Sequence, residues 1–344
     1  MKQSLSRFAI PFLCLSSVCL AHNGGHQHGH EGDERAHLME EVGKLSEVTD
    51  VSKLEARDGL AWLHGEEKPY SGWVRKTWQV RHKHAPGWHE HSHPKQTRLA
   101  RFKGGIPAES RWLDEDNLLK KMTMFAGKDS QEEKTWVSSF LKAMNTGVGL
   151  FMTLEGRTGN EPLVARYTEW SENGTKKRAA KILEYNKDGY RKEDFTDWHN
   201  NGQVSEQGQS WRRGHYNIYG GKLVSFYRNG QKRSKELWDY GKPVTIKVWK
   251  TNGEKCPETK VAEGMGTYAW RDKYRGEIYV VHSYMDGLLH GPSIWYQDGE
   301  KKAVQNWVKG KRQGTEIKHG HDEKRMESTL GGKLDGTKIK RNMQ

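Results

Sequence analysis

Short runs of alternating hydrophobic and polar residues, separated by recurring turns, organise most of this chain. An aromatic residue followed closely by Asn-Gly or Asp-Gly recurs between residues 170 and 299. One series of five copies is Trp170-Ser-Glu-Asn173-Gly174, Trp198-His-Asn-Asn201-Gly202, Tyr227-Arg-Asn229-Gly230, Trp249-Lys-Thr-Asn252-Gly253 and Tyr296-Gln-Asp298-Gly299. Their glycines are 28, 28, 23 and 46 residues apart, and 46 is twice 23. Such a fixed period indicates a repeat architecture.

A second series of glycines lies between the members of the first. Its members are Gly241, Gly264, Gly287 and Gly310, each 23 residues after the last, with Gly332 after a step of 22. Together the two series place a turn after alternating steps of 12 and 11 residues, until a last step of 10. Asn-Gly and Asp-Gly supply the positive φ angles of two-residue hairpin turns, and about eight residues remain for each strand. We therefore predict a mainly all-β fold, an extended antiparallel β-meander of hairpin repeats, regular over 161–341.

The preceding segment, 51–160, repeats more loosely, and one part of it has a different period. Ser130-Gln-Glu-Glu133 matches a helix capping box, and Gly147 is a suitable C-cap. Between them, one helical face collects apolar side chains: Trp136, Phe140, Leu141 and Met144. We predict one inserted helix over about 130–146, packed on the sheet. An irregular pair of strands is the alternative.

The N-terminus carries the pattern of an export signal. Lys2 and Arg7 precede an apolar run of 13 residues, and Cys19-Leu20-Ala21 offers small residues before a polar stretch. This predicts a signal peptide over 1–21, cleaved to give a secreted or periplasmic protein. The alternatives are a lipoprotein anchored at Cys19 and a buried core helix. Residues 22–50, rich in His and Gly, are predicted to form a flexible leader.

Composition and charge narrow the class of protein. The chain has a net charge of +13, and loss of Lys2 and Arg7 with the signal peptide lowers it to +11. It is polar, yet it holds 14 Trp, 13 Tyr and 8 Phe, more aromatic residues than a disordered chain would have. Cys256 is the single cysteine after cleavage, so no internal disulfide is expected. No second long apolar segment follows, so no transmembrane segment is predicted in the mature chain.

The repeat unit resembles a known family. Phe226-Tyr227-Arg-Asn-Gly230-Gln231-Lys232 and Trp295-Tyr296-Gln-Asp-Gly299-Glu-Lys301 are similar to the MORN-variant repeat of toxin–antitoxin system YwqK-type antitoxins. The resemblance is strong over about 160–341 and weaker over 54–160. It implies a scaffold that binds proteins or anionic lipid. An antitoxin acts in the cytoplasm, so this role does not fit a chain with an export signal.

The repeated aromatic and turn residues have two possible uses. The rings could stack on sugars or partner side chains, or they could form cross-strand ladders that hold the sheet together. Recurrence at one position in each unit favours the structural use. The predicted ladder and turn residues are Trp170, Gly174, Trp198, Gly202, Tyr227, Gly230, Trp249, Gly253, Gly287, Gly291, Tyr296, Gly299, Gly310 and Gly314.

A histidine-rich loop replaces one of the expected turns. It contains His82, His84, His89, His91 and His93, and the last three alternate, so they share one face of an extended chain. Imidazoles grouped in this way can bind zinc, copper or nickel. Adventitious metal binding and a solvated polar loop are the other interpretations. No other cofactor is predicted.

The sequence lacks the common catalytic motifs, namely Gly-x-Ser-x-Gly, a phosphate-binding loop and His-Glu-x-x-His. We therefore predict a protein that is not an enzyme: an exported scaffold binding a protein or an anionic envelope polymer or lipid through its repeat sheet. Nucleic acid is a poor partner for an exported chain. An envelope metal-binding protein that uses the histidine-rich loop is the alternative, and a purely structural spacer is the third hypothesis.

Overall fold

The computed structural model describes residues 31–78, 81–82, 91–92, 95–126, 135–146, 164–213, 216–318, 327–330 and 333–335. The predicted signal peptide, with Cys19, lies outside these residues. So do the proposed helix caps at Ser130–Glu133 and Gly147.

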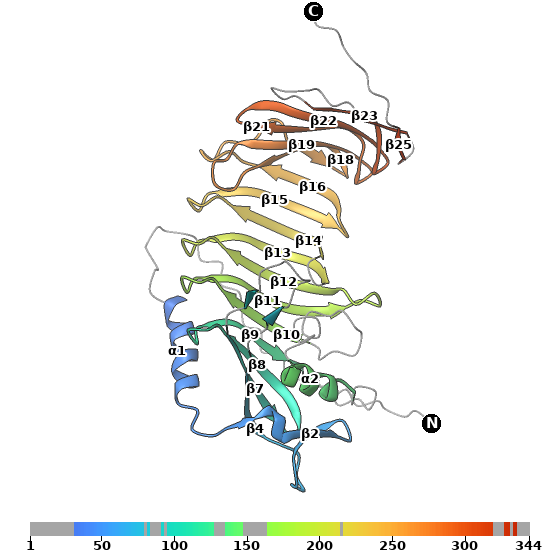
Figure 1. Ribbon diagram of the computed structural model, residues 1–344. Helices are drawn as coiled ribbons and strands as arrows, with labels where there is room; N and C mark the ends of the chain where they lie inside the picture. The colour runs from blue at the N-terminus through green and yellow to red at the C-terminus, as the bar shows by residue number, and fades with distance from the viewer. Residues whose placement is uncertain are drawn as a thin grey trace, which may run out of the picture.

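The strands form one long sheet in which neighbours in the chain are neighbours in the sheet (Figure 1). Its first part holds β4 (Gly72–Trp78), β7 (Gln96–Lys103), β8 (Ile106–Leu113), β9 (Leu119–Phe125) and β10 (Val164–Trp170). Its middle part holds β11 (Lys176–Tyr185), β12 (Arg191–Trp198), β13 (Val204–Arg213), β14 (Tyr216–Phe226), β15 (Lys232–Asp239), β16 (Lys242–Val248) and β17 (Lys260–Ala262). Its last part holds β18 (Met265–Arg271), β19 (Ile278–Met285), β20 (Leu288–Leu289), β21 (Gly291–Gln297), β22 (Glu300–Val308), β23 (Lys311–Lys318), β24 (Glu327–Leu330) and β25 (Lys333–Asp335).

Each strand runs antiparallel to the next, which confirms the predicted meander, and β20 and β21 are successive segments that both pair with β19. At the first edge, β1 (Val48–Asp50) pairs in parallel with β4. A short 3-10 helix, η1 (Val51–Lys53), then leads into a separate hairpin of β2 (Leu54–Arg57) and β3 (Leu60–Leu63).

Most turns at the two edges of the array differ in kind, and Asp188-Gly189 and Asp298-Gly299 are exceptions. At Tyr240-Gly241, Glu263-Gly264, Asp286-Gly287 and Lys309-Gly310, both residues have positive φ, as two-residue turns require. In the Asn-Gly turns only the glycine has positive φ. The asparagine side-chain oxygen accepts a hydrogen bond from the backbone N–H two residues later, as Asn229 does from Gln231 at 3.1 Å. The prediction of two-residue turns is therefore wrong for the Asn-Gly pairs. They are three-residue loops, because the asparagine side chain and the glycine together close the longer turn.

This difference accounts for one pair of the alternating steps. Nine residues separate Gly241 from the three-residue loop that ends at Gly253, and nine more precede the two-residue turn that ends at Gly264. These steps are therefore 12 and 11, because the segments between the turns have the same length. The later steps of 12 have other causes: a longer loop ends at Gly276, and ten residues precede the two-residue turn Asp298-Gly299.

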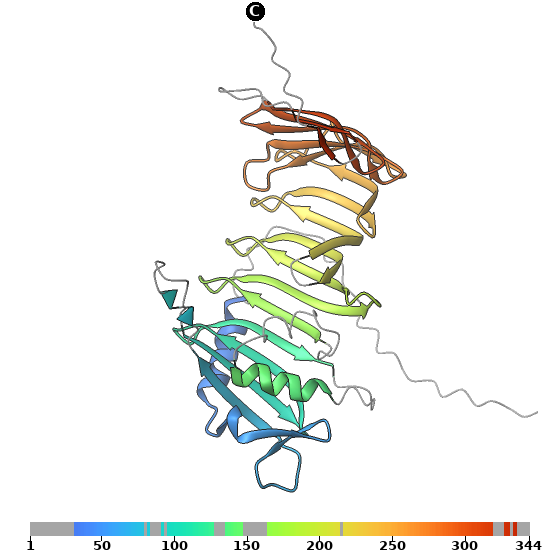
Figure 2. The ribbon, with the colours of Figure 1, turned by 45° about the vertical axis from the view of Figure 1, so that its right-hand side comes forward.

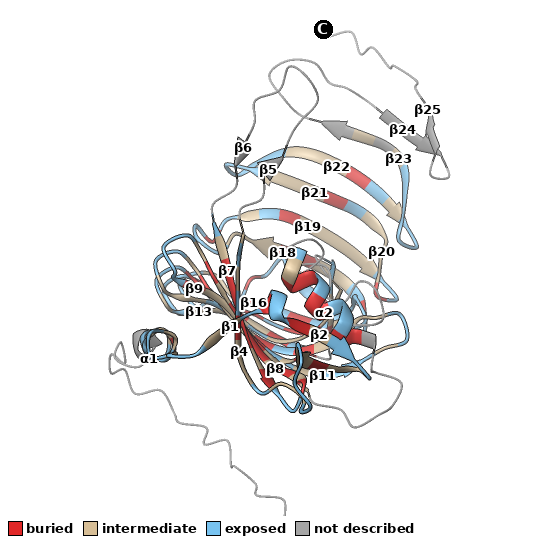
Figure 3. Ribbon diagram, turned by 60° about the horizontal axis from the view of Figure 1, so that its bottom comes forward, coloured by how far each residue is buried: buried red, intermediate tan, exposed pale blue. Residues whose placement is uncertain are grey.

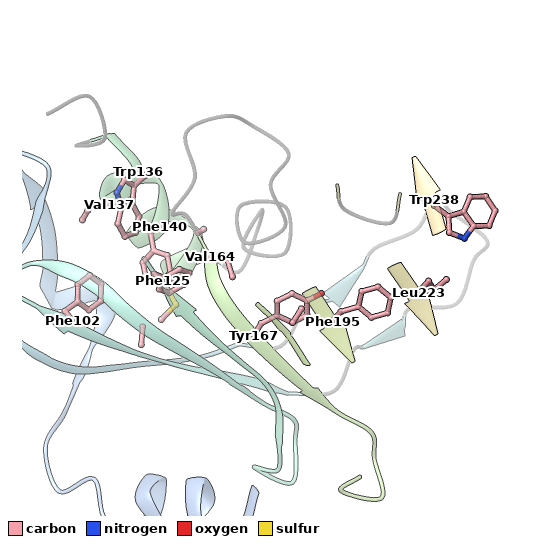
Figure 4. Close-up of a cluster of buried hydrophobic side chains, with 14 of the residues drawn as sticks. Phe102, Phe125, Trp136, Val137, Phe140, Val164, Tyr167, Phe195, Leu223 and Trp238 are labelled. Atoms are coloured by element: carbon pink, nitrogen blue, oxygen red, sulfur yellow. The ribbon is translucent and has the colours of Figure 1, made fainter. Parts of the chain in front are cut away.

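The predicted inserted helix is present as α2 (Thr135–Thr146). Phe140 and Met144 are fully buried, and the Phe140 ring lies 5.9 Å from that of Phe102 and 5.7 Å from that of Phe125, edge to face. We call the side of the sheet that faces α2 the inner face. Figure 4 shows its buried side chains continuing from α2 to Tyr167, Phe195, Leu223 and Trp238.

A second helix, α1 (Glu31–Gly43), lies on the opposite side, which we call the outer face (Figure 2). Its Leu38 packs in a cluster with Leu99, Leu113, Leu119 and Trp170. The guanidinium of buried Arg111 donates to the Leu38 carbonyl at 2.9 Å and to the Glu41 carboxylate at 2.6 Å. The leader expected to be flexible over 22–50 thus holds a helix from Glu31, because the sheet supplies an apolar patch and a buried cation beneath it.

Buried and exposed positions alternate along β15 and β16, as a sheet with one exposed face requires. Figure 3 shows buried residues within α2 and along β21 and β22, with exposed residues at the turns. None of the helices within the described part of the chain is long and apolar enough to cross a membrane.

Candidate functional site

The predicted ladder aromatics all make contacts within the sheet or with α1. Trp170 is buried beneath α1, and the buried Tyr227 hydroxyl donates to the Trp249 carbonyl at 2.7 Å. Trp198 and Trp249 are half-buried, with the ammonium groups of Lys176 and Lys232 at 5.7 and 5.4 Å from their ring centroids. Half-buried Tyr296 pairs across the strands with Lys301. These contacts lie within the protein, as expected for residues that hold the sheet together.

The turn glycines also have structural roles. All nine predicted positions adopt positive φ: Gly174, Gly202, Gly230, Gly253, Gly287, Gly291, Gly299, Gly310 and Gly314. This backbone conformation strains other residues and suits glycine.

The structure describes only part of the histidine-rich loop. The backbones of β5 (Arg81–His82) and β6 (His91–Ser92) pair, with His82 opposite His91. His84, His89 and His93 lie outside the described residues. In the described ranges no three His, Cys, Asp or Glu side chains come together as a metal site. The metal hypothesis therefore stays a prediction.

A buried ion network crosses β10–β12 on the inner face. Glu193 has no exposed side-chain surface, and its carboxylate lies 2.9 Å from the Arg178 guanidinium and 2.6 Å from that of Arg191. The Tyr167 hydroxyl donates to the same carboxylate at 3.0 Å, and Arg178 also pairs with Asp197 at 2.8 Å. Burial opposes the charge on Glu193, but the two guanidinium groups outweigh it and hold the pKa of Glu193 below its ordinary value.

A second polar cluster continues the inner face across β13–β18. One Glu236 carboxylate oxygen accepts from the Tyr268 hydroxyl at 2.8 Å, and the other accepts from the Trp238 indole N–H at 2.7 Å. Two strands away, Glu206 accepts from the Tyr219 hydroxyl at 3.3 Å. Burial, and then the charge of Glu236, raise the pKa of Glu206 to about 7. Glu206 can therefore gain or lose a proton near neutral pH.

Sequence reasoning missed both clusters. Arg191, Glu193, Phe195 and Asp197 alternate along β12, so the pattern shows that they share a face. Charged residues usually mark the solvent side, however, and the sequence alone does not show that this charged row is the buried one.

The outer face of β15–β17 carries a row of three exposed lysines. Lys235 pairs directly with Lys247 across β15 and β16. Ile246 on β16 pairs with Val261 on β17, and the same register places Lys260 of β17 beside Lys247 of β16. Each lysine alternates with buried residues of the inner face, so all three point outward. We call this set the lysine row.

No ion pair within the described ranges involves the lysine row. Other lysines of the sheet do have acidic partners: Lys121 lies 2.8 Å from Glu169, and Lys176 lies 2.7 Å from Glu34. Glu258, which precedes Lys260 on the chain, instead accepts from the Cys256 thiol and lies 3.5 Å from Arg271. The row is therefore a patch of uncompensated positive charge.

Comparison with known proteins gives no match: neither a scan against protein-family models nor a search of curated proteins finds a relative of this chain. The resemblance to MORN-variant repeats therefore stays a prediction. What the chain binds has to be argued from its own side chains.

Proposed function

We propose that this protein is an exported, non-catalytic repeat scaffold that holds an anionic partner, a protein or an envelope component, on the outer face of its sheet. The observation that carries the proposal is the lysine row, three outward-pointing ammonium groups on adjacent strands without acidic partners. Uncompensated charge of one sign attracts ligands of the other sign and speeds their encounter.

The inner face supports this proposal by keeping the row in place. A binding surface works best when its groups are already held in their final positions. Beneath the row, Ser234 and Glu236 on β15 and Ile246 on β16 are all buried. The hydrogen bonds of Glu236 link β15 to β18, so the strands that carry the lysines are joined across the inner face.

Binding measurements at physiological salt test the proposal. The purified protein is presented with an acidic polysaccharide, vesicles of an anionic lipid, an acidic protein and a neutral polysaccharide. At least one anionic ligand should bind, and raising the salt concentration should weaken it because exposed charges are screened. If no anionic ligand binds better than the neutral one, the proposal is wrong.

Export is tested separately. N-terminal sequencing of protein recovered outside the cytoplasm should begin at His22, after the small residue Ala21. Recovery of intact Met1 from that fraction, or of the chain only from the cytoplasm, would contradict this part of the proposal.

Metal binding in the envelope is the second candidate function, favoured by one observation. The backbones of His82 and His91 face each other across β5 and β6, so the ends of the loop converge. Calorimetric titration with zinc, copper and nickel tests it. Specific binding should disappear in the combined variant His89→Ala, His91→Ala and His93→Ala, and weak binding that survives this change would exclude the candidate.

A further inference from the structure

The lysine row belongs to a longer line of side chains that runs along the array, at right angles to the strands. The register continues from Lys260 to Thr267 on β18 and Ser283 on β19. In the other direction, Lys235 is followed by Val224 on β14 and Gln207 on β13. Seven adjacent strands thus contribute one side chain each to a line of three cations, one apolar side chain and three neutral polar groups.

The spacing along this line is set by the sheet. Neighbouring strands lie about 4.8 Å apart, so the lysines repeat at that interval. Like charges directly opposite each other on neighbouring strands are unfavourable. Lys235 and Lys247 are in that arrangement, and Lys260 extends it to a third strand. An anion lying along the row would remove this repulsion.

The composition of the line favours a sugar polymer over a protein or a membrane. Lysine and serine are depleted at protein–protein interfaces, where buried aromatic residues and arginine supply most of the affinity. A surface that enters the headgroup region of a bilayer needs large apolar side chains, and the line contains only Val224. Hydroxyl and amide groups next to ammonium groups suit a ligand that carries both hydroxyls and negative charges.

We propose that the line from Gln207 to Ser283 binds a linear acidic polysaccharide that lies along the array, with its carboxylates against Lys235, Lys247 and Lys260. In a polyuronate, the kind of acidic polysaccharide meant here, every sugar ring carries one carboxylate, so the charges repeat on a scale comparable with the strand spacing. Its ring hydroxyls meet Gln207, Thr267 and Ser283 on either side of the lysines. This inference rests on the proposed function and names the partner.

The test uses polygalacturonate as the probe and dextran as the neutral reference. Wild-type protein is compared with the combined variant Lys235→Gln, Lys247→Gln and Lys260→Gln. Its matched control is Lys68→Gln, Lys187→Gln and Lys301→Gln, which removes the same charge from exposed positions outside the line. The row variant should bind polygalacturonate about 10- to 100-fold more weakly, since three exposed ion pairs are lost. The control should change affinity less than about threefold, because distant exposed charges are screened.

A conservative variant separates charge from folding. Lys235→Arg, Lys247→Arg and Lys260→Arg keep the positive charge, and this protein should retain binding within a few-fold of wild type. Circular dichroism and the thermal midpoint of each variant should match those of wild type, because these side chains point away from the buried face. If the arginine variant is folded and does not bind, the row does not act through charge, and the inference is overturned.

The remaining outcomes separate this inference from the proposed function. If vesicles of phosphatidylglycerol or an acidic protein bind through the row and polygalacturonate does not, the polysaccharide is excluded while the scaffold proposal stands. If the glutamine variant binds every anionic ligand as wild type does, both proposals fail. If dextran binds as tightly as polygalacturonate, the carboxylates are not what is recognised, and the inference is again overturned.

Discussion

The first part of the sheet and its middle part are held together in different ways. Strands β4 and β7–β10 lie between two helices, with α1 on the outer face and α2 on the inner face. From β12 to β17, no helix in the described part of the chain lies on the outer face, and the inner face buries charged and polar groups beside its aromatic residues. We call the first part the apolar sandwich after its inner face, although its outer face also buries an ion pair of Arg111 and Glu109 beneath α1. Along the inner face, the sheet thus changes from apolar packing to a polar array.

The difference follows from how much apolar material each part has. Fully burying a side chain such as Phe140 or Met144 stabilises the fold by about 1.5–3 kcal/mol, and α2 supplies several such side chains to the first part. The middle part has fewer, so ion pairs and hydrogen bonds such as those of Glu193 and Glu236 fill its inner face. Buried polar groups are tolerated when all of them are paired. Within the described residues, the outer face of the middle part thus stays free of a covering helix, as the proposed binding surface requires.

The largest expected effect is in the apolar sandwich. Phe140→Ala removes a fully buried ring that contacts both Phe102 and Phe125, and it should lower the free energy of unfolding by about 4 kcal/mol. Chemical denaturation measures the loss, and amide hydrogen exchange should show it first in β7–β9. Lys142→Ala, on the exposed side of the same helix, is the control and should change stability by less than about 0.5 kcal/mol. Equal effects of the two changes would mean that α2 is not packed through Phe140.

A slightly smaller effect is expected from breaking the ion network of the middle part. Glu193→Gln leaves Arg178 and Arg191 without their shared carboxylate, and it should cost about 3 kcal/mol, because buried cations lose their counter-charge. The pair of half-buried Lys192 and exposed Glu184 provides the control, and Glu184→Gln should cost well under 1 kcal/mol. If Glu193→Gln proves as mild as the control, the network does not hold β10–β12 together, and the contrast between the two parts of the sheet disappears.

The sequence predicts those elements whose position depends on residues close together in the chain. Asn229-Gly230 and Asp286-Gly287 determine where strands end, and Trp136, Phe140 and Met144 at helical spacing determine α2. The sequence does not show that α1 is ordered, because the order comes from Leu99 and Arg111, distant in the chain. The lysine row also cannot be recognised from the sequence. Lys235, Lys247 and Lys260 are separated by 12 and 13 residues, and only the register of the turns between them brings them into line.

The next prediction concerns pH and the second polar cluster. The pKa of Glu206 is raised to about 7 in the folded protein, against an ordinary 4.5, so the folded state binds the proton more tightly than the unfolded state. The stabilisation is therefore fully present below pH 4.5 and is lost as the pH rises through 7. Between pH 5 and pH 8, wild type should lose on the order of 1–2 kcal/mol relative to Glu206→Gln, whose side chain stays neutral. Unfolding in urea at both pH values measures the difference, and parallel pH profiles of the two proteins would show that Glu206 does not titrate in this range.

The smallest expected effect concerns backbone strain at Glu263, in one of the two-residue turns. Glu263 has a φ of 50°, a conformation that strains a residue with a side chain, and it begins the two-residue turn between β17 and β18. Glu263→Gly should therefore raise the free energy of unfolding by about 0.5–1 kcal/mol, seen as a small rise in the thermal midpoint. Glu300→Gly is the matched change at the first residue of β22, where φ is not positive, and it should lower stability by a similar amount, since glycine weakens a strand. The opposite signs are the diagnostic result, because both variants lose an exposed carboxylate. Glu300 also pairs with Lys302 at 3.0 Å, but an exposed ion pair contributes little to stability. If both changes destabilise the protein, Glu263 is not under strain in its two-residue turn.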